Sequence, residues 1–245
     1  MMTQRPSESE AGGGPGDERT VFLLDVDNTL LDNDAAKAEL GKRIRDHLGA
    51  DCAQRFWAVY EEVRAESTVV SYPLTLARYW EETDPAATVA TRAELADLVV
   101  EFPYADFLYP GALETVAHLR RFGRTVVLSD GDPAYQPSKI ARAGIDGAVD
   151  GFVLVYGHKE EHLREITAAF PADRYVLVED KPDNLVKVRA ALDAVLPGVP
   201  FTGVLVRQGK YAAAASDGDT PGVDLSLPAF RDLRDLDLAG ITGAG

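Results

Sequence analysis

The sequence predicts an α/β protein, a Rossmann-like parallel sheet flanked by helices, with an all-helical insert. After residue 110, short apolar runs with strand character alternate with single helical segments. Between the first apolar run, Val21 to Leu24, and this alternating region lies a long stretch with helical patterning and no strand-like segment. Strands separated by single helices indicate a parallel sheet with right-handed crossovers.

The predicted units follow one another along the chain. They are a disordered tail (1–19), an α/β core in two parts (20–31 and 105–208), a helical insert (32–104) and a partly docked C-terminal tail (209–245). The first unit is rich in glycine, serine and charge, with almost nothing to bury. Four helices are expected in the insert, and a capping box at Thr91-Arg-Ala-Glu94 opens the last of them.

Five apolar runs form the predicted strands of the core. They are Val21 to Leu24, Thr125 to Leu128, Gly151 to Tyr156, Arg174 to Val178 and Phe201 to Val206. Helical segments separate the later ones, at 112–122, 138–143, 160–169 and 185–196. In the tail, the segment 225–236 is the one expected to dock on the core.

Composition narrows the function classes. The chain has 245 residues and a formal net charge of −15, a field that repels nucleic acid and anionic membranes. Its single cysteine, Cys52, forms no internal disulfide, which favours a reducing compartment. No run approaches the roughly 20 apolar residues of a membrane span, and the N-terminus has no apolar signal core. We expect a cytoplasmic protein that needs a local cation and positive groups to bind an anionic substrate.

Polar side chains follow the predicted strands at the point where each strand ends. Four strand ends carry such residues: Asp25 and Asp27, Ser129 and Asp130, Lys159, and Glu179 and Asp180. The carboxyl ends of parallel strands are where ligands bind in α/β sheets. The sequence therefore predicts one site at this edge of the sheet.

Asp25 and Asp27 are the first of these residues. Two acids at i and i+2 lie on one side of an extended chain, and like charges that close ionise together only beside a positive partner. A hard divalent ion with oxygen ligands, Mg²⁺ above all, meets that need. An acidic turn that ends a strand is the alternative interpretation of this stretch.

The set of motifs resembles the haloacid dehalogenase superfamily, in its aspartyl-nucleophile phosphatase type. Asp25-Val-Asp-Asn-Thr29 matches the D-x-D-x-T motif of that family, Ser129 its lone Ser/Thr motif, Lys159 its lysine motif, and Glu179-Asp180 its terminal acidic motif. A helical insert directly after the first motif resembles the family's cap. The similarity covers residues 21 to 207.

The resemblance implies a phosphohydrolase and a role for each residue. Asp25 is the expected nucleophile, Asp27 the acid/base, and Lys159 the charge that neutralises Asp25 and the transferring oxygens. Thr29, Ser129 and Asp130 are the expected phosphate-binding residues.

Mg²⁺ is the expected cofactor. The resemblance implies that Asp25 binds it through the side chain, Asp27 through its backbone carbonyl and Asp180 as the other protein ligand. Glu179 is a weaker metal ligand candidate, and Asp183 or Asn184 could take its place.

Other residues receive different interpretations. Lys139 competes for the lysine role, but it falls inside a helix and is expected on the solvated surface. Lys181 is expected in a surface turn before Pro182, and Cys52 is expected to be structural. Asp132 and Tyr135 are candidates for substrate contacts. Asn28 has no assigned task.

The leading function is a Mg²⁺-dependent phosphatase acting on a small phosphorylated metabolite. A dehalogenase needs no acid/base residue two positions after the nucleophile, so Asp27 disfavours it. The same residue disfavours a phosphonatase, which would need a Schiff-base lysine such as Lys37 or Lys42. A sugar phosphomutase and a non-catalytic binding protein of the same fold stay open, as do the substrate and the oligomeric state.

Overall fold

A parallel sheet forms the centre of the protein, as the sequence predicts, and it has six strands where five were expected. The computed structural model describes residues 19–67, 71–82, 89–213, 221–238 and 241, so the tail predicted to be disordered lies outside the described residues apart from Arg19. The strand order is β3-β2-β1-β4-β5-β6. The strands are β1 (Thr20–Leu24), β2 (Arg124–Asp130), β3 (Val153–Tyr156), β4 (Arg174–Glu179), β5 (Phe201–Val206) and β6 (Leu225–Leu227).

Helices cover both faces of the sheet, which explains why β1 is apolar at successive positions. Phe22 and Leu24 pack into one apolar cluster, while Val21 and Leu23 pack into another on the opposite face. The first cluster includes residues of α5 (Ala112–Leu119), α6 (Gln136–Arg142), α7 (Ile145–Ala148) and η3 (Phe230–Asp235). The second includes residues of α8 (Leu163–Ala169) and α9 (Pro182–Val195).

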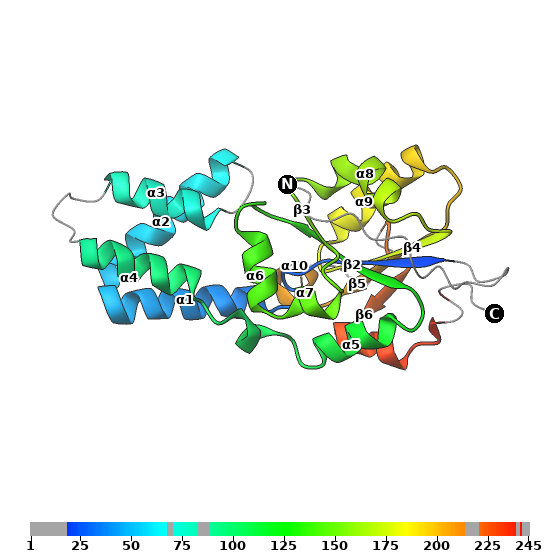
Figure 1. Ribbon diagram of the computed structural model, residues 1–245, viewed down its shortest axis with the longest axis horizontal. Helices are drawn as coiled ribbons and strands as arrows, with labels where there is room; N and C mark the ends of the chain where they lie inside the picture. The colour runs from blue at the N-terminus through cyan, green and yellow to red at the C-terminus, as the bar shows by residue number, and fades with distance from the viewer. Residues whose placement is uncertain (1–18, 68–70, 83–88, 214–220, 239–240, 242–245) are drawn as a thin grey trace.

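The helical insert between β1 and β2 lies at one end of the molecule, away from the sheet (Figure 1). It consists of α1 (Asn33–Leu48), α2 (Ala50–Ser67), α3 (Tyr72–Glu82) and α4 (Val89–Val100), followed by η1 (Tyr104–Phe107). α4 begins two residues before the predicted capping box at Thr91. Aromatic side chains pack against one another inside the insert, with Phe56 5.2 Å from Trp57 and 6.3 Å from Tyr72 between ring centroids.

The two chain segments that join the insert to the sheet lie side by side. Leu31 forms an antiparallel bridge with Leu108. Asp32 donates its backbone N–H to the carbonyl of Phe107, and Tyr109 donates to Leu30. These bonds fix the start of the insert beside its end, directly next to the strand that carries Asp25.

The C-terminal segment adds a strand that sequence patterning did not distinguish. β6 pairs in parallel with β5, with Val204 opposite Leu225 and Val206 opposite Leu227. Only three residues long, β6 offers too little alternation to stand out in a tail rich in small and acidic residues. After it, Phe230 and Leu233 are buried in the core. Within the described residues, no helix combines the length and apolarity needed to cross a membrane.

Candidate active site

Sheet register brings the polar residues of four strands to one edge. Leu24, the last residue of β1, lies opposite Val127 of β2 and Val178 of β4. Asp25 follows at once, and its backbone N–H donates to the carbonyl of Val178. β2 and β4 extend further and end at Asp130 and Glu179. Asp25, the residue after β1, therefore lies between the ends of β2 and β4, the two strands that flank β1.

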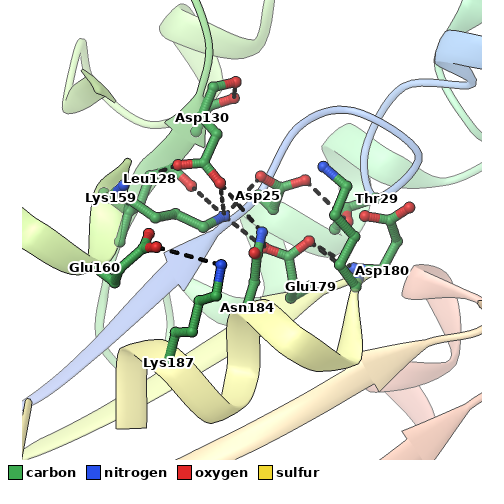
Figure 2. Close-up of polar contacts among 12 residues, drawn as sticks. Asp25, Thr29, Leu128, Asp130, Lys159, Glu160, Glu179, Asp180, Asn184 and Lys187 are labelled. Carbon is green, nitrogen blue, oxygen red and sulfur yellow. Dashed lines mark hydrogen bonds and ion pairs between the residues drawn. The ribbon is translucent and has the colours of Figure 1, made fainter. Parts of the chain in front are cut away.

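Lys159 occupies the centre of this cluster (Figure 2). Its side chain is fully buried, and Nζ lies 2.9 Å from Asp25 Oδ1 and 2.5 Å from Glu179 Oε2. Burial alone would lower the pKa of this ammonium group, but the charges of Asp25, Glu179 and Asp130 raise it well above its ordinary value. The predicted lysine is thus a permanent positive charge in direct contact with the predicted nucleophile.

Asp130 orients Lys159. Its Oδ1 accepts the backbone N–H of Lys159 at 2.9 Å, and its Oδ2 accepts Asn184 Nδ2 at 3.1 Å. Because these protein donors occupy the carboxylate, we reassign the Asp130 side chain from phosphate binding to positioning. Asn184 also donates to Glu179, whereas the neighbouring Asp183 is exposed.

Asp180 has the chemistry of a metal ligand. Carboxylate oxygens of Asp25, Glu179 and Asp180 lie within 4.8 Å of one another. Asp180 is fully buried, yet neither of its carboxylate oxygens has a hydrogen-bond partner among the described residues. Burial, with the charges of Glu179 and Asp25, raises the pKa of Asp180 to about 9. A buried carboxylate without a donor is costly unless a cation binds it, so these residues fit a hard divalent ion.

Glu179 differs from the other two acids because protein donors satisfy both of its oxygens. Oε1 accepts the backbone N–H groups of Asp180 and Lys181, and Oε2 accepts Lys159 and Asn184. Burial raises the pKa of Glu179, but the charges of Lys159 and Lys181 outweigh it and lower the pKa to about 2. Asp25, in contrast, has its pKa raised to about 7 by burial and by the charge of Glu179. Asp25 and Asp180 would therefore be the carboxylates that hold a cation, whereas Glu179 binds protein donors next to them.

Asp27 forms an ion pair with a second lysine, Lys139. Lys139 Nζ lies 2.5 Å from Asp27 Oδ1 and 2.7 Å from Asn33 Oδ1, and the lysine side chain is only 4% exposed. The expectation that Lys139 lies on the solvated surface is wrong. α6 presents this residue to the junction of sheet and insert, where Asp27 and Asn33 converge.

The short polar residues of the first two motifs have distinct places. Thr29 Oγ1 donates to Asp25 Oδ2 at 3.5 Å, and Ser129 Oγ accepts Gln136 Nε2 at 3.2 Å. Both residues are buried. Asn28, which had no assigned task, adopts φ 62° and accepts the backbone N–H groups of Asn33 and Asp34. It therefore caps the start of α1, a role that suits the tolerance of asparagine for left-handed backbone.

A cavity of about 180 Å³ opens next to these residues, between the sheet edge and the insert. Asp27, Asp130 and Lys139 line it from the core, and Lys37 and Tyr60 from the insert. Lys181, expected in a surface turn, also lines this cavity. Of the two suggested substrate contacts, Tyr135 lines the cavity, whereas Asp132 accepts a hydrogen bond from Ser71 of the insert at 2.5 Å.

Comparisons with known proteins are consistent with this geometry. A family model described as haloacid dehalogenase-like hydrolase matches residues 20–199. A solved haloacid dehalogenase-like hydrolase from Burkholderia xenovorans is 36% identical, with 90% of this chain and 99% of that chain covered and a TM-score of 0.76. None of the curated proteins compared matches the chain.

Two further structures share the fold at lower identity. The L-2-haloacid dehalogenase of Xanthobacter autotrophicus is 17% identical, covering 89% of this chain and 98% of its own, with a TM-score of 0.54. A hydrolase of the same family from Bacillus subtilis, solved bound to magnesium, is 13% identical, covering 92% and 98%, with a TM-score of 0.56. These likenesses concern the fold.

The cation site predicts a specific thermal shift. In the metal-free protein the raised pKa values of Asp25 and Asp180 mean that the folded state holds more protons than the unfolded state between about pH 4 and 9, so its stability falls as pH rises. A divalent cation binds the deprotonated carboxylates, so the stabilisation by Mg²⁺ should grow with pH. At 100 times Kd it should reach about 2.7 kcal/mol, measured by thermal unfolding.

Asp180→Asn should lose this Mg²⁺ shift, whereas Asp183→Asn, at an exposed acid in the first turn of α9, should keep it. A shift that survives Asp180→Asn, or that shrinks as pH rises, would contradict this cation site.

Proposed function

Because this chain belongs to the haloacid dehalogenase-like hydrolases, we propose that it is a Mg²⁺-dependent phosphohydrolase that cleaves a small phosphorylated metabolite through an aspartyl-phosphate intermediate. One observation carries the proposal: the unpartnered, buried carboxylate of Asp180 beside Asp25. A cation next to the nucleophile would allow the carboxyl groups of Asp25 and Asp180 to ionise together. Transfer of a phosphoryl group uses that charge, whereas displacement of a halide by an aspartate does not need it.

Each residue has a task in the proposed reaction. Asp25 attacks phosphorus and forms a P–O bond as the bond to the leaving group breaks. Asp27 gives a proton to the departing oxygen, and its carboxylate then takes a proton from the water that attacks the aspartyl-phosphate. The second attack releases inorganic phosphate and restores Asp25.

Positive charge and hydrogen-bond donors support this chemistry. Lys159 lies against Asp25 and would stabilise charge on the transferring oxygens. Thr29, which contacts the other oxygen of Asp25, would bind a phosphoryl oxygen together with Ser129. Mg²⁺ held by Asp25 and Asp180 would supply Lewis-acid stabilisation.

Lys139 extends the set of residues that sequence motifs indicate. Its contact with Oδ1 leaves Oδ2 of Asp27 available for proton transfer. Since Asn33 at the start of α1 binds the same ammonium group, the insert and the core hold Asp27 jointly. We propose that the insert acts as a cap over the cavity.

Asp25→Asn tests the nucleophile. The substitution removes the attacking oxyanion and keeps the shape of the side chain, so kcat for 4-nitrophenyl phosphate should fall by about 10³-fold or more. Phosphate release should also stop when a chelator removes Mg²⁺. If the wild type and Asp25→Asn hydrolyse the ester equally, or if the wild type instead acts on a 2-haloacid without metal, the proposal fails. Asp183→Asn serves as the matched control.

The Lys139–Asp27 pair predicts a dependence on the leaving group. A 4-nitrophenolate departs without a proton, whereas an alkoxide needs one. Lys139→Met should therefore lower kcat/KM for an alkyl phosphate about tenfold more than for 4-nitrophenyl phosphate, and Asp27→Asn should show the same selectivity more strongly. Lys187→Met, at an exposed lysine of α9, should affect both esters alike. If Lys139→Met lowered kcat/KM equally for both esters, this would contradict a role of Lys139 in proton transfer by Asp27.

A further inference from the structure

The cavity beside the active site is positively charged in a strongly acidic protein. Among the described residues, five lysine or arginine side chains line it, against three carboxylates, while the chain as a whole carries a net charge of −15. Lys139 and Lys181 belong to the part of the lining near Asp25. The other three, Lys37, Arg64 and Lys210, form what we term the outer cluster.

The carboxylates of the lining already have cationic partners. Asp27 binds Lys139, and Asp130 lies 3.8 Å from Lys159 Nζ. Asp34 accepts the backbone N–H of Lys210 and lies 3.7 Å from its Nζ. Among the described residues of the cavity wall, no carboxylate forms an ion pair with Lys37 or Arg64.

Lys37 and Arg64 share one acid at the rim. Glu61 lies 4.0 Å from Lys37 Nζ and 3.3 Å from an Arg64 nitrogen, and its side chain is 57% exposed. An exposed carboxylate at such distances contributes little. Two cations that share one weak partner leave a positive charge directed at the cavity.

Lys37 is also poorly solvated for a lysine. Its side chain is 21% exposed, and Nζ lies 4.2 Å from the ring centroid of Tyr60 and 5.3 Å from that of Trp57. Burial lowers its pKa. The ammonium group therefore lies beside two aromatic rings with little water around it. Such a group is suited to bind an anion that enters the cavity and replaces the remaining water.

The third side of the cluster comes from α10 (Gly209–Ala213), which lies near the junction of insert and sheet (Figure 1). Tyr211 accepts a hydrogen bond from Arg64 of α2 at 3.4 Å, and the ring of Tyr211 lies 5.3 Å from Lys181 Nζ. Tyr211 therefore connects the insert, the sheet edge and α10. These contacts bring Arg64 and Lys181 to the same ring in the cavity wall, while Lys139 of the same wall pairs with Asp27.

We propose that the outer cluster binds a second anionic group on the leaving-group side of the substrate, so that the substrate is a small phosphate monoester that also carries a carboxylate or a second phosphate. The inference rests on the proposed phosphohydrolase function. The phosphoryl group reacts at Asp25, and the second anion binds Lys37, Arg64 and Lys210. The cavity volume of about 180 Å³ suits a small ligand.

Matched phosphate esters test this substrate class. The probes are carboxyalkyl phosphates with linkers of one to four carbons, the corresponding neutral carboxamides, and alkanediol bisphosphates. We expect kcat/KM of the wild type with Mg²⁺ to be about tenfold higher for an anionic ester than for its carboxamide. The better of the two anionic series identifies the group that the cluster binds. Equal kcat/KM for anionic and neutral esters would overturn the inference and leave the phosphohydrolase function intact.

Variants test whether the outer cluster causes the preference for anionic over neutral esters. Lys37→Gln and Lys210→Gln should each lower the anionic-to-neutral ratio several-fold. Lys42→Gln removes the same charge from α1 at a side chain that is 63% exposed and paired with Asp46, so it should leave the ratio unchanged. A ratio that survives Lys37→Gln, or that falls equally in Lys42→Gln, would overturn the inference. Thermal unfolding verifies that each variant is folded.

A binding measurement separates this inference from the proposed function. Calorimetric titration of Asp25→Asn with the same ester pairs reports affinity without turnover. Tighter binding of the anionic ester by Asp25→Asn, combined with a wild type that hydrolyses no phosphate ester, would support the outer cluster and refute the phosphohydrolase. Equal affinity for both members of each pair would refute the cluster.

Discussion

The buried ammonium group of Lys159 is the interaction on which the site depends. It contacts carboxylates that follow β1 and end β4, and it lies near the carboxylate that ends β2. Its own position follows β3. Residues at the ends of four strands of the parallel sheet thus surround a single ammonium group. If Lys159 were absent, Asp25 and Glu179 would be two buried acids that keep only the weaker interaction with the charge of Lys181, and breaking a buried ion pair in this way is strongly destabilising.

Charge is distributed unequally along the cavity. Near the sheet, the carboxyl groups of Asp25, Glu179 and Asp180 outnumber the cations Lys159 and Lys181, and this excess of acids would attract a divalent cation. On the insert side, Lys37 and Arg64 outnumber their acidic partners. A ligand with two anionic groups would match both regions once the cation is present. The field of the whole protein, at −15, makes such local positive charge more selective because it repels anions elsewhere on the surface.

Strand-end reasoning recovered much of the site from the sequence because continuous apolar runs are short-range signals. It found Asp25, Lys159 and Asp180 together, and their contacts follow from the register of a parallel sheet. It missed Lys139, since the face that a helical residue presents depends on where the helix begins and how it packs. The same limit applies to Lys37, Arg64 and Tyr211, which approach one another from three separate helices. One signal for Lys139 was present: Asp27, in an acidic chain, needed a cationic partner other than Lys159.

Asp25 and Asp27 are two residues apart but have different surroundings, and this difference separates their proposed tasks. Asp25 is buried against Lys159 and next to the unpartnered Asp180, so its environment suits a nucleophile that works beside a cation. The side chain of Asp27 is 27% exposed, lines the cavity and binds Lys139 through one oxygen. A proton carrier must reach both the leaving group and water, and Asp27 alone of the two has that access. The two residues are of the same type, so their different surroundings account for their different proposed tasks. A separate lysine for each acid allows Asp27 to exchange protons while Lys159 stays in place beside Asp25.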